Sequence, residues 1–256
     1  MARIFVTGSA DGLGLGAARA LLDGGHEVVL HARNAQRAGD LRRTEPRAGQ
    51  IVVGDLSSVA GTREVAARAD DTGRFDAVIH NAGIGYTAAR RQETADGLER
   101  HFAVNVLAPY LLTALITRPD RLVYLSSGMH EGGHASLDDP QWTRRRWSGS
   151  GAYSDTKLLD VVLAFAVARR WTDVRSNAVD PGWVATRMGG RGAPESLASG
   201  VRTQVWLATG DDPAADVTGR YFYHQRAREP LAATKRADLQ DRLLDYCAGL
   251  TGVPLP

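Results

Sequence analysis

Two residues of this lysine-poor chain have the spacing and the chemistry of an acid–base pair. The sequence has 31 basic side chains, and only two of them, Lys157 and Lys235, are lysines. Lys157 follows Tyr153 by four residues, so on a helix both side chains would lie on the same face. An ammonium beside a phenol favours the phenolate and lowers the phenol pKa towards neutrality. The pair therefore predicts a tyrosine that can donate or accept a proton.

A glycine-rich turn near the N-terminus has the features of a dinucleotide-binding site. It reads Thr-Gly-Ser-Ala-Asp-Gly-Leu-Gly over residues 7–14, after the apolar run 4–6 and before a helical pattern at 14–23. Glycines allow a pyrophosphate to approach the backbone, and a helix N-terminus supplies free N–H groups. Strand, glycine turn and helix in this order predict dinucleotide binding. A turn without a ligand is the alternative.

The elements needed to position these motifs alternate along the 256 residues. Strand-like runs occur at 4–6, 28–30, 51–53, 77–80, 122–125, 174–179 and 221–223, and helical patterns occur at 14–23, 34–43, 58–69, 98–117, 152–171, 195–208 and 235–249. Continuous apolar strands separated by helices predict a doubly wound α/β fold of about seven parallel strands, with helices on both faces. We expect one domain over 1–256, with an irregular insertion at 128–151.

Composition narrows the class of protein. The hydrophobic fraction of 43% is enough for a large core, and a net charge of +2 does not indicate a nucleic-acid partner. The single cysteine, Cys247, excludes an internal disulfide and a cysteine-based metal cluster, so no metal site is predicted. No signal peptide or membrane-spanning run is found, which predicts a cytoplasmic protein that does not enter membranes.

In this order, the Gly turn, Asn81-Ala82-Gly83, Tyr153-x-x-x-Lys157 and Pro181-Gly182 make the chain resemble the short-chain dehydrogenase/reductase family over essentially its whole length. It looks most like the branch with retinol dehydrogenases, the WW-domain oxidoreductase and bacterial carbonyl reductases. That closer match is carried by the segments 125–127 and 137–139 and by His130, Trp142, Ala152 and Tyr153.

The resemblance implies roles for four catalytic residues. Tyr153 would protonate a carbonyl oxygen or deprotonate an alcohol, and Lys157 would lower its pKa and bind the nicotinamide ribose. Ser127 would hold the substrate oxygen, although Ser126 is its neighbour and Ser127 could merely cap a turn. Asn105 would position a water in a proton relay; a buried structural asparagine is the alternative.

The resemblance also implies a nicotinamide cofactor. The end of the second strand has Arg33 where NAD-binding proteins place an acid, so NADP(H) is predicted over NAD(H). Asp11 opposes this prediction, because an acid there would repel a 2′-phosphate, whereas Ser9 could donate to it. The cofactor residues implied are Gly8, Ser9, Gly12, Leu13, Gly14, Arg33, Asp55, Leu56, Asn81, Ala82, Gly83, Tyr153, Lys157, Pro181, Gly182, Val184 and Thr186.

The sequence therefore favours an NADP(H)-dependent reductase of ketones or aldehydes, with a small carbonyl or alcohol substrate of apolar body. A mobile lid is expected at about 187–200, where glycines follow Trp183. A non-catalytic NAD(P)-sensing regulatory protein is the main alternative, and a nucleotide-sugar epimerase would need a larger C-terminal domain. The helix at 158–168 is apolar nearly all round, which predicts either a homodimer or a helix covered within one subunit.

Overall fold

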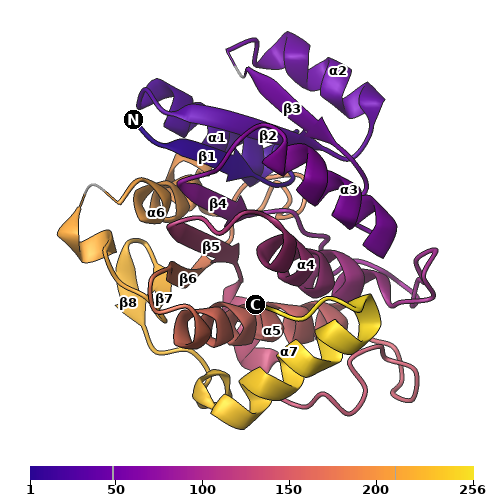
Figure 1. The fold of residues 1–256 in the computed structure, drawn as a ribbon. Coiled ribbons are helices and arrows are strands. Elements are labelled where there is room, and N and C mark those ends of the chain that lie inside the picture. The colour runs from indigo at the N-terminus through magenta and orange to yellow at the C-terminus, as the bar shows by residue number, and fades with distance from the viewer. Residues whose placement is uncertain (48, 211) are drawn as a thin grey trace.

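An eight-stranded sheet runs through the middle of the molecule (Figure 1). The computed structural model describes residues 1–47, 49–210 and 212–256. The strand order is β3-β2-β1-β4-β5-β6-β7-β8; all neighbours pair in parallel except β7 and β8, which are antiparallel. The strands are β1 (Arg3–Val6), β2 (Glu27–Ala32), β3 (Gln50–Val53), β4 (Ala77–His80), β5 (Arg121–Leu125), β6 (Arg175–Asp180), β7 (Tyr221–Tyr223) and β8 (Arg226–Arg228). The predicted doubly wound fold is confirmed.

Helices cover both faces of the sheet, as continuous apolar strands require. One face packs against α1 (Gly12–Asp23), α2 (Ala35–Thr44) and α6 (Leu197–Thr209). The other face packs against α3 (Val59–Asp70), α4 (Ala108–Leu115) and α5 (Gly149–Arg170), and α7 (Ala237–Thr251) lies on α5. The short elements are a π-helix, η1 (Phe102–Leu107), and three 3₁₀ helices, η2 (Gly128–Gly132), η3 (Pro213–Ala215) and η4 (Ala232–Lys235).

The strand order reverses between β1 and β4, which are adjacent although two strands separate them in sequence. A ligand crevice in such a sheet opens at the carboxyl ends of the strands on either side of this reversal. Here those ends lead into the turn 7–14 and the segment 81–83. The topology therefore brings together the two glycine-containing motifs, as predicted.

Three features differ from the elements that the sequence predicts. The predicted helix at 98–117 begins as the π-helix η1 and continues as α4. The insertion at 128–151 contains η2, and its last residues already belong to α5. The hairpin strand β8 was not predicted, because its turn is His224-Gln225, two residues that favour positive φ less than glycine or asparagine does.

Helix α5 is buried along almost its whole length within the chain. Residues 152–168 are all buried, and α7, η2 and β6 pack against this helix. Leu243 and Cys247 of α7 are fully buried in that contact region. Of the two alternatives for the apolar helix at 158–168, the structure thus shows coverage within one subunit. The homodimer stays a prediction without support from this helix.

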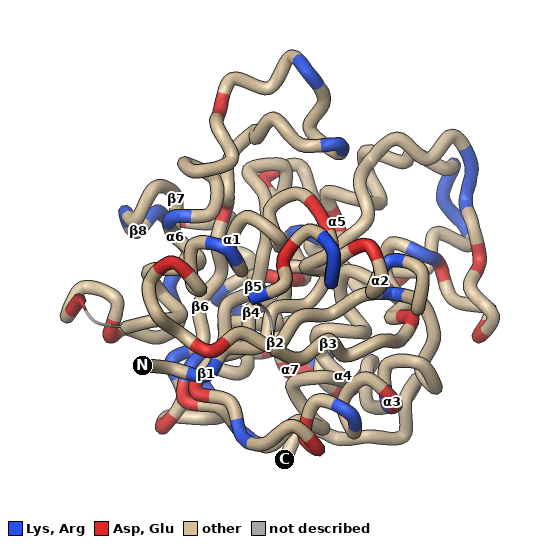
Figure 2. Tube along the Cα trace, turned by 90° about the horizontal axis from the view of Figure 1, so that it is seen from above, with Lys and Arg blue, Asp and Glu red and all other residues tan. Residues whose placement is uncertain are grey.

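Charged positions are spread around the outside of the trace (Figure 2). Blue and red segments both occur on the peripheral helices and loops, and neither sign covers a whole side of the trace in this view. This distribution agrees with the small net charge of +2. No helix in the described ranges is both long and apolar enough to cross a membrane.

Candidate active site

The turn between β1 and α1 is built so tightly that only glycine fits at two positions. Gly8 has φ of 62°, and a Cβ there would lie 2.8 Å from the Cα of Ala82. A Cβ on Gly14 would lie 2.4 Å from the Gly8 carbonyl oxygen. Real side chains do not tolerate either contact, so the turn keeps its backbone bare on the side that borders the crevice.

Thr7 and Asn81 tie this turn to the end of β4. The Thr7 hydroxyl accepts hydrogen bonds from the backbone N–H groups of Asn81 and Ala82, both at 3.0 Å. The Asn81 amide in turn donates to the carbonyl oxygens of Thr7 at 2.9 Å and Gly8 at 3.2 Å. These contacts fix the two motifs relative to each other and give Asn81 a structural role at the end of β4.

His31, which sequence reasoning did not select, supports the turn from below. Its Nδ1 accepts from the Gly8 N–H at 3.0 Å, and its Nε2 donates to the Gly54 carbonyl oxygen at 2.9 Å. This pair of contacts requires the neutral ring. Burial lowers the pKa of His31 and keeps the ring neutral, although its bond to Gly54 and the charge of Asp55 oppose that shift.

Ser9 does not lie where the phosphate prediction needs it. Its side chain is fully buried, accepting from the His31 N–H at 2.7 Å and contacting the His31 carbonyl oxygen at 3.4 Å. Both contacts join β1 to β2 beneath the turn, and Ser9 is absent from the residues that line the crevice. The geometry therefore makes Ser9 a support of the turn rather than a phosphate donor.

Two arginines surround the end of β2. Arg33 is exposed and lines the crevice, together with Arg37 from the first turns of α2. Arg37 forms an ion pair of 2.6 Å with Asp11. Asp11, the acid that opposed the NADP(H) prediction, is therefore neutralised by Arg37 of α2. Arg37 was missed in the sequence because nothing local indicates that α2 faces the glycine turn.

The crevice has a volume of about 370 Å³ and collects most of the predicted cofactor residues. Asp55 borders it, and one of its carboxylate oxygens accepts from the Ser57 N–H at 2.9 Å. The predicted residues among those lining it are Gly8, Gly12, Leu13, Gly14, Arg33, Asp55, Leu56, Asn81, Ala82, Gly83 and Thr186. A bare glycine backbone, a helix N-terminus and the arginines among the lining residues fit a dinucleotide phosphate chain.

Tyr153 and Lys157 lie together on the buried face of α5, as their spacing predicts. Tyr153 is 7% exposed and Lys157 is 5% exposed, and the ammonium lies 5.7 Å from the centre of the phenol ring. Ser127 follows β5; its hydroxyl accepts from the Met129 N–H at 3.2 Å and opposes the rise in the pKa of the Tyr153 phenol. The structure thus groups three of the predicted catalytic residues, and the catalytic role of Ser127 stays a prediction. Ser126 instead donates to the Lys157 carbonyl oxygen at 2.7 Å.

The pKa of Tyr153 is shifted in the direction opposite to the one predicted from the sequence. Burial raises it above the ordinary value, while the Lys157 ammonium and the Ser127 hydroxyl oppose this rise without cancelling it. The expectation that Lys157 brings the phenol towards neutrality neglected the cost of placing a phenolate in a buried site. In this environment, burial outweighs the neighbouring cation.

Asn105 lies in the π-helix η1, and both ends of its amide are engaged. Its Oδ1 accepts from the Ile84 N–H at 2.9 Å, and its Nδ2 donates to the Ile84 carbonyl oxygen at 3.2 Å and the Thr156 hydroxyl at 3.0 Å. These bonds connect the end of β4 to α5 next to Lys157. A π-helical turn is often found at functional sites, and here it directs Asn105 towards this junction.

The segment after β6 borders the crevice at Thr186, Arg187 and Met188, whereas Pro181, Gly182 and Val184 are not among the lining residues. Gly182 has φ of 84° and donates to the Asp180 carboxylate at 2.8 Å, and a Cβ on it would overlap the Glu195 carboxylate. Val184 is buried, whereas Thr186 lines the crevice. Asp180 thus holds the Gly182 N–H, and the Glu195 carboxylate leaves room for glycine alone at position 182.

The segment predicted as a lid at about 187–200 is joined to the residues before it. Val184 and Glu195 form an isolated parallel bridge, and the Trp183 indole donates to the Gly189 carbonyl oxygen at 2.9 Å. Its last residues form the first turn of α6. Met188 projects into the crevice opening and is 42% exposed. Movement of this segment stays a prediction.

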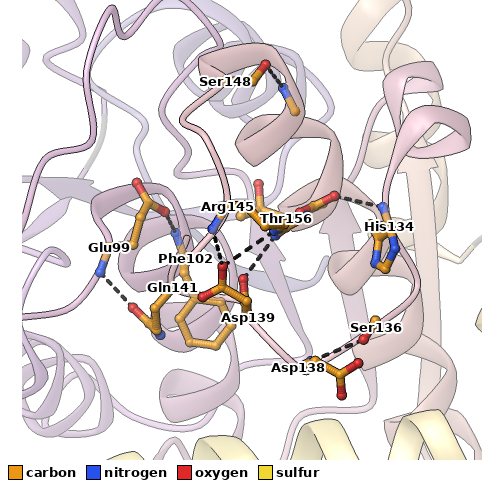
Figure 3. A network of polar contacts seen from close by, with 12 residues as sticks. Glu99, Phe102, His134, Ser136, Asp138, Asp139, Gln141, Arg145, Ser148 and Thr156 are labelled. Carbon is orange, nitrogen blue, oxygen red and sulfur yellow. Dashed lines mark hydrogen bonds and ion pairs between the residues drawn. The ribbon is translucent and has the colours of Figure 1, made fainter. Parts of the chain in front are cut away.

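Polar contacts anchor the insertion at 128–151 to α5 (Figure 3). Asp139 accepts from the N–H groups of Thr143, Arg144 and Arg145 and from the Thr143 hydroxyl, at 2.8–3.1 Å. Burial opposes its charge, yet these bonds together hold the Asp139 pKa well below its usual range. Arg145 forms a 2.7 Å ion pair with Asp155, two residues after Tyr153. The insertion is therefore an ordered segment that is bonded to α5 close to Tyr153.

Comparison with known proteins agrees with this geometry. The family model described as short chain dehydrogenase matches residues 2–195. The chain belongs to the short-chain dehydrogenase family. It is an oxidoreductase, and the prediction of this family is confirmed.

Individual relatives extend the match over the whole chain. Short-chain dehydrogenase chyC of Penicillium rubens is 42% identical over 260 residues, covering 100% of both chains. Retinol dehydrogenase 13 of Homo sapiens is 28% identical over 291 residues, covering 99% of this chain and 85% of its own, which supports the predicted branch. A crystal structure of a protein from Mycobacterium Paratuberculosis superposes with a TM-score of 0.82 at 28% identity, covering 100% of this chain and 95% of that one.

Proposed function

We propose that this oxidoreductase uses NADP(H) to reduce a ketone or an aldehyde to the alcohol, and catalyses the reverse oxidation when the alcohol is in excess. The observation that carries the proposal is the grouping of Tyr153, Ser127 and Lys157 near Gly83, which lines a glycine-rich crevice with two arginines at the end of β2. When bound, the nicotinamide supplies or accepts the hydride.

The residues of the crevice suit each part of this cofactor. The turn at 8–14 and the N-terminus of α1 would hold the pyrophosphate, and Asp55 with Leu56 would border the adenine. Arg33 would pair with the 2′-phosphate, aided by Arg37 once its bond to Asp11 is shared. The segment 181–186, with Pro181, Gly182, Val184 and Thr186, would border the nicotinamide, and Asn81, Ala82 and Gly83 would pass behind the adenosine ribose.

The catalytic side chains would then act on the substrate oxygen. Ser127 donates a hydrogen bond to it and fixes its position, while the Tyr153 phenol transfers its proton as negative charge develops there. The raised pKa of Tyr153 keeps the phenol protonated, which suits a proton donor in the direction of reduction. Lys157 stabilises the phenolate that remains, and Asn105 holds the strand end beside it. Tyr86, whose ring lies 5.6 Å from that of Tyr153, and the exposed Trp183 and Met188 would offer an apolar border to the rest of the substrate.

The deciding experiment compares wild type with Tyr153→Phe on ketones, aldehydes and quinones, following the consumption of NADPH and NADH. We expect NADPH to be preferred and turnover by the variant to fall by about 10²–10⁴-fold, the usual contribution of a positioned acid. Tyr246→Phe on α7 is the matched control, since its hydroxyl lies outside the crevice.

Two results would contradict the proposal. Tight NADPH binding without turnover on any carbonyl or alcohol would favour the cofactor-sensing alternative. Turnover that Tyr153→Phe leaves unchanged would exclude the mechanism even if NADPH were preferred.

A further inference from the structure

The Lys157 ammonium is held by two acceptors that the mechanism above does not use. It donates to the Leu125 carbonyl oxygen at 2.6 Å and to the Asp160 carboxylate at 2.8 Å. Both charged side chains are buried, with exposures of 7% for Lys157 and 3% for Asp160. An ammonium has three N–H donors, so one remains available for a partner next to Tyr153.

The contact with Lys157 accounts for the presence of an acid at the buried position 160. Asp160 follows Lys157 by three residues on α5, facing β5, and Lys157 is the only ion-pair partner it has among the described residues. A carboxylate and an ammonium are each costly to bury alone, and removing one partner leaves the other uncompensated. The chain therefore keeps an acid directly beneath its catalytic lysine.

Several titratable groups lie on the elements around this pair, but Asp160 forms its ion pair with Lys157. On α5 the neighbouring titratable group is Tyr153, and Tyr124 of β5 lies close enough for the Asp160 charge to raise its pKa further after burial has done so. Among the described residues, the other titratable groups on elements packed against α5 are Arg121 on β5, His130 and Glu131 on η2, Arg175 and Asp180 on β6, Lys235 on η4, and Asp238, Asp241, Arg242, Asp245, Tyr246 and Cys247 on α7.

We propose that Asp160 is a positioning residue for the reaction: its carboxylate neutralises Lys157, holds the ammonium below Tyr153, and keeps it protonated while Tyr153 exchanges its proton. This inference rests on the proposed function of the same site. It attributes the protonated state of Lys157 to Asp160, an acid that lies outside the Tyr-x-x-x-Lys motif.

The titration behaviour of the pair agrees with its geometry. Burial opposes the charge of Lys157, but the Asp160 carboxylate more than offsets this and holds the pKa of Lys157 above its usual value. Burial also raises the pKa of Asp160 to about 7, against the pull of the ammonium. Above neutral pH the two therefore form an ion pair, and loss of the carboxylate would leave burial to drive Lys157 towards its neutral form.

The scarcity of lysine makes a direct test practical. In protein labelled with ¹³C-lysine, Lys157 and Lys235 give the only lysine side-chain signals, and Lys235→Arg assigns them. In wild type we expect the Lys157 signal to keep the shift of the ammonium form up to about pH 10. In Asp160→Asn, which keeps the shape and removes the charge, the Lys157 titration should move down by about one unit or more.

Asp155→Asn is the matched control, because Asp155 is another buried acid of α5 but pairs with Arg145 instead. It should leave the Lys157 titration unchanged. In the carbonyl assay, the alkaline limit of turnover by Asp160→Asn should move down together with the Lys157 signal, a shift that a merely structural defect would not produce.

Equal Lys157 titrations in wild type and Asp160→Asn would overturn the proposal. If Asp160→Asn does not fold, the wild-type titration decides: a proton retained to about pH 10 supports the assignment, and one lost well below that pH excludes it. Because the signal needs no turnover, failure to find a carbonyl substrate would count against the proposed function and not against this pairing.

Discussion

At the scale of single residues, cofactor preference depends on which charges lie at the end of β2. Arg33 is exposed at the crevice and Arg37 is paired with Asp11 at 2.6 Å. A charge-assisted bond to a phosphate contributes about 1.5–3 kcal/mol. We therefore expect Arg33→Ala to raise the KM for NADPH by about tenfold or more while leaving the KM for NADH unchanged.

Arg42→Ala is the control for this measurement, since Arg42 is exposed on the same helix as Arg37 but away from the crevice. Steady-state kinetics with both cofactors would separate the variants. A parallel rise of both KM values in Arg33→Ala would mean that Arg33 supports the fold of the crevice instead of reading the phosphate.

Residues of this site were predictable where their relation is local. Tyr153 and Lys157 share one helix face, and Gly8, Gly12 and Gly14 lie within seven residues of the chain, so spacing alone indicates their chemistry. His31 and Arg37 were missed because their partners belong to other elements. Asp160 was missed because it lies outside the Tyr-x-x-x-Lys motif, although it follows Lys157 by only three residues. The same limit misplaced Ser9, whose contacts with His31 appear only once β1 and β2 pair.

At the scale of elements, periodicity predicted most strands and helices. The π-helix η1 and the hairpin after β7 were not predicted, because they depend on contacts between elements. The π-turns of η1 occur in a segment whose apolar pattern fits an ordinary helix, and they bring Asn105 to Ile84 and Thr156. The hairpin after β7 uses His224 and Gln225 at positive φ, held by a bond of 3.0 Å from the Gln225 N–H to Thr203 on α6. Periodicity contains no information on either contact.

The insertion at 128–151 yields an element-scale prediction. Asp139 holds it with four accepted hydrogen bonds, whereas the adjacent Asp138 is exposed and makes a 3.4 Å contact with Arg242. Asp139→Asn replaces one acceptor oxygen with a donor and removes the charge. We expect amide hydrogen exchange in residues 140–147 to quicken by about tenfold, equivalent to about 1.4 kcal/mol of local stability.

Asp138→Asn should leave that exchange unchanged, because its carboxylate is solvated. Mass-spectrometric exchange of the two variants and wild type at one pH would make the comparison. Similar acceleration in both variants, or in neither, would show that the insertion is held mainly by packing of Trp142 and Trp147.

At the scale of the whole molecule, polar groups buried between the sheet and the helices link stability to pH. His80 on β4 is buried, stacks on Tyr124 at 4.7 Å and contacts the Thr113 hydroxyl at 3.1 Å through Nε2. Its Nδ1 has no partner within the described part of the chain. A protonated ring would therefore leave a charged N–H without an acceptor, and burial lowers the pKa of His80 to about 3.

The sign of the pH effect follows from that shift. Since the unfolded histidine takes up a proton near pH 6.5 and the folded one only near pH 3, the contribution of His80 is fully present above pH 6.5 and is lost as pH falls towards 3. Between pH 7 and pH 5 the loss amounts to about 2 kcal/mol. His80→Phe, which keeps a ring against Tyr124, should be less stable at pH 7 but lose about 2 kcal/mol less over that interval. Urea unfolding at pH 7, 6 and 5 would measure both slopes, and equal slopes would show that other groups, such as the buried His31, control the acid limit.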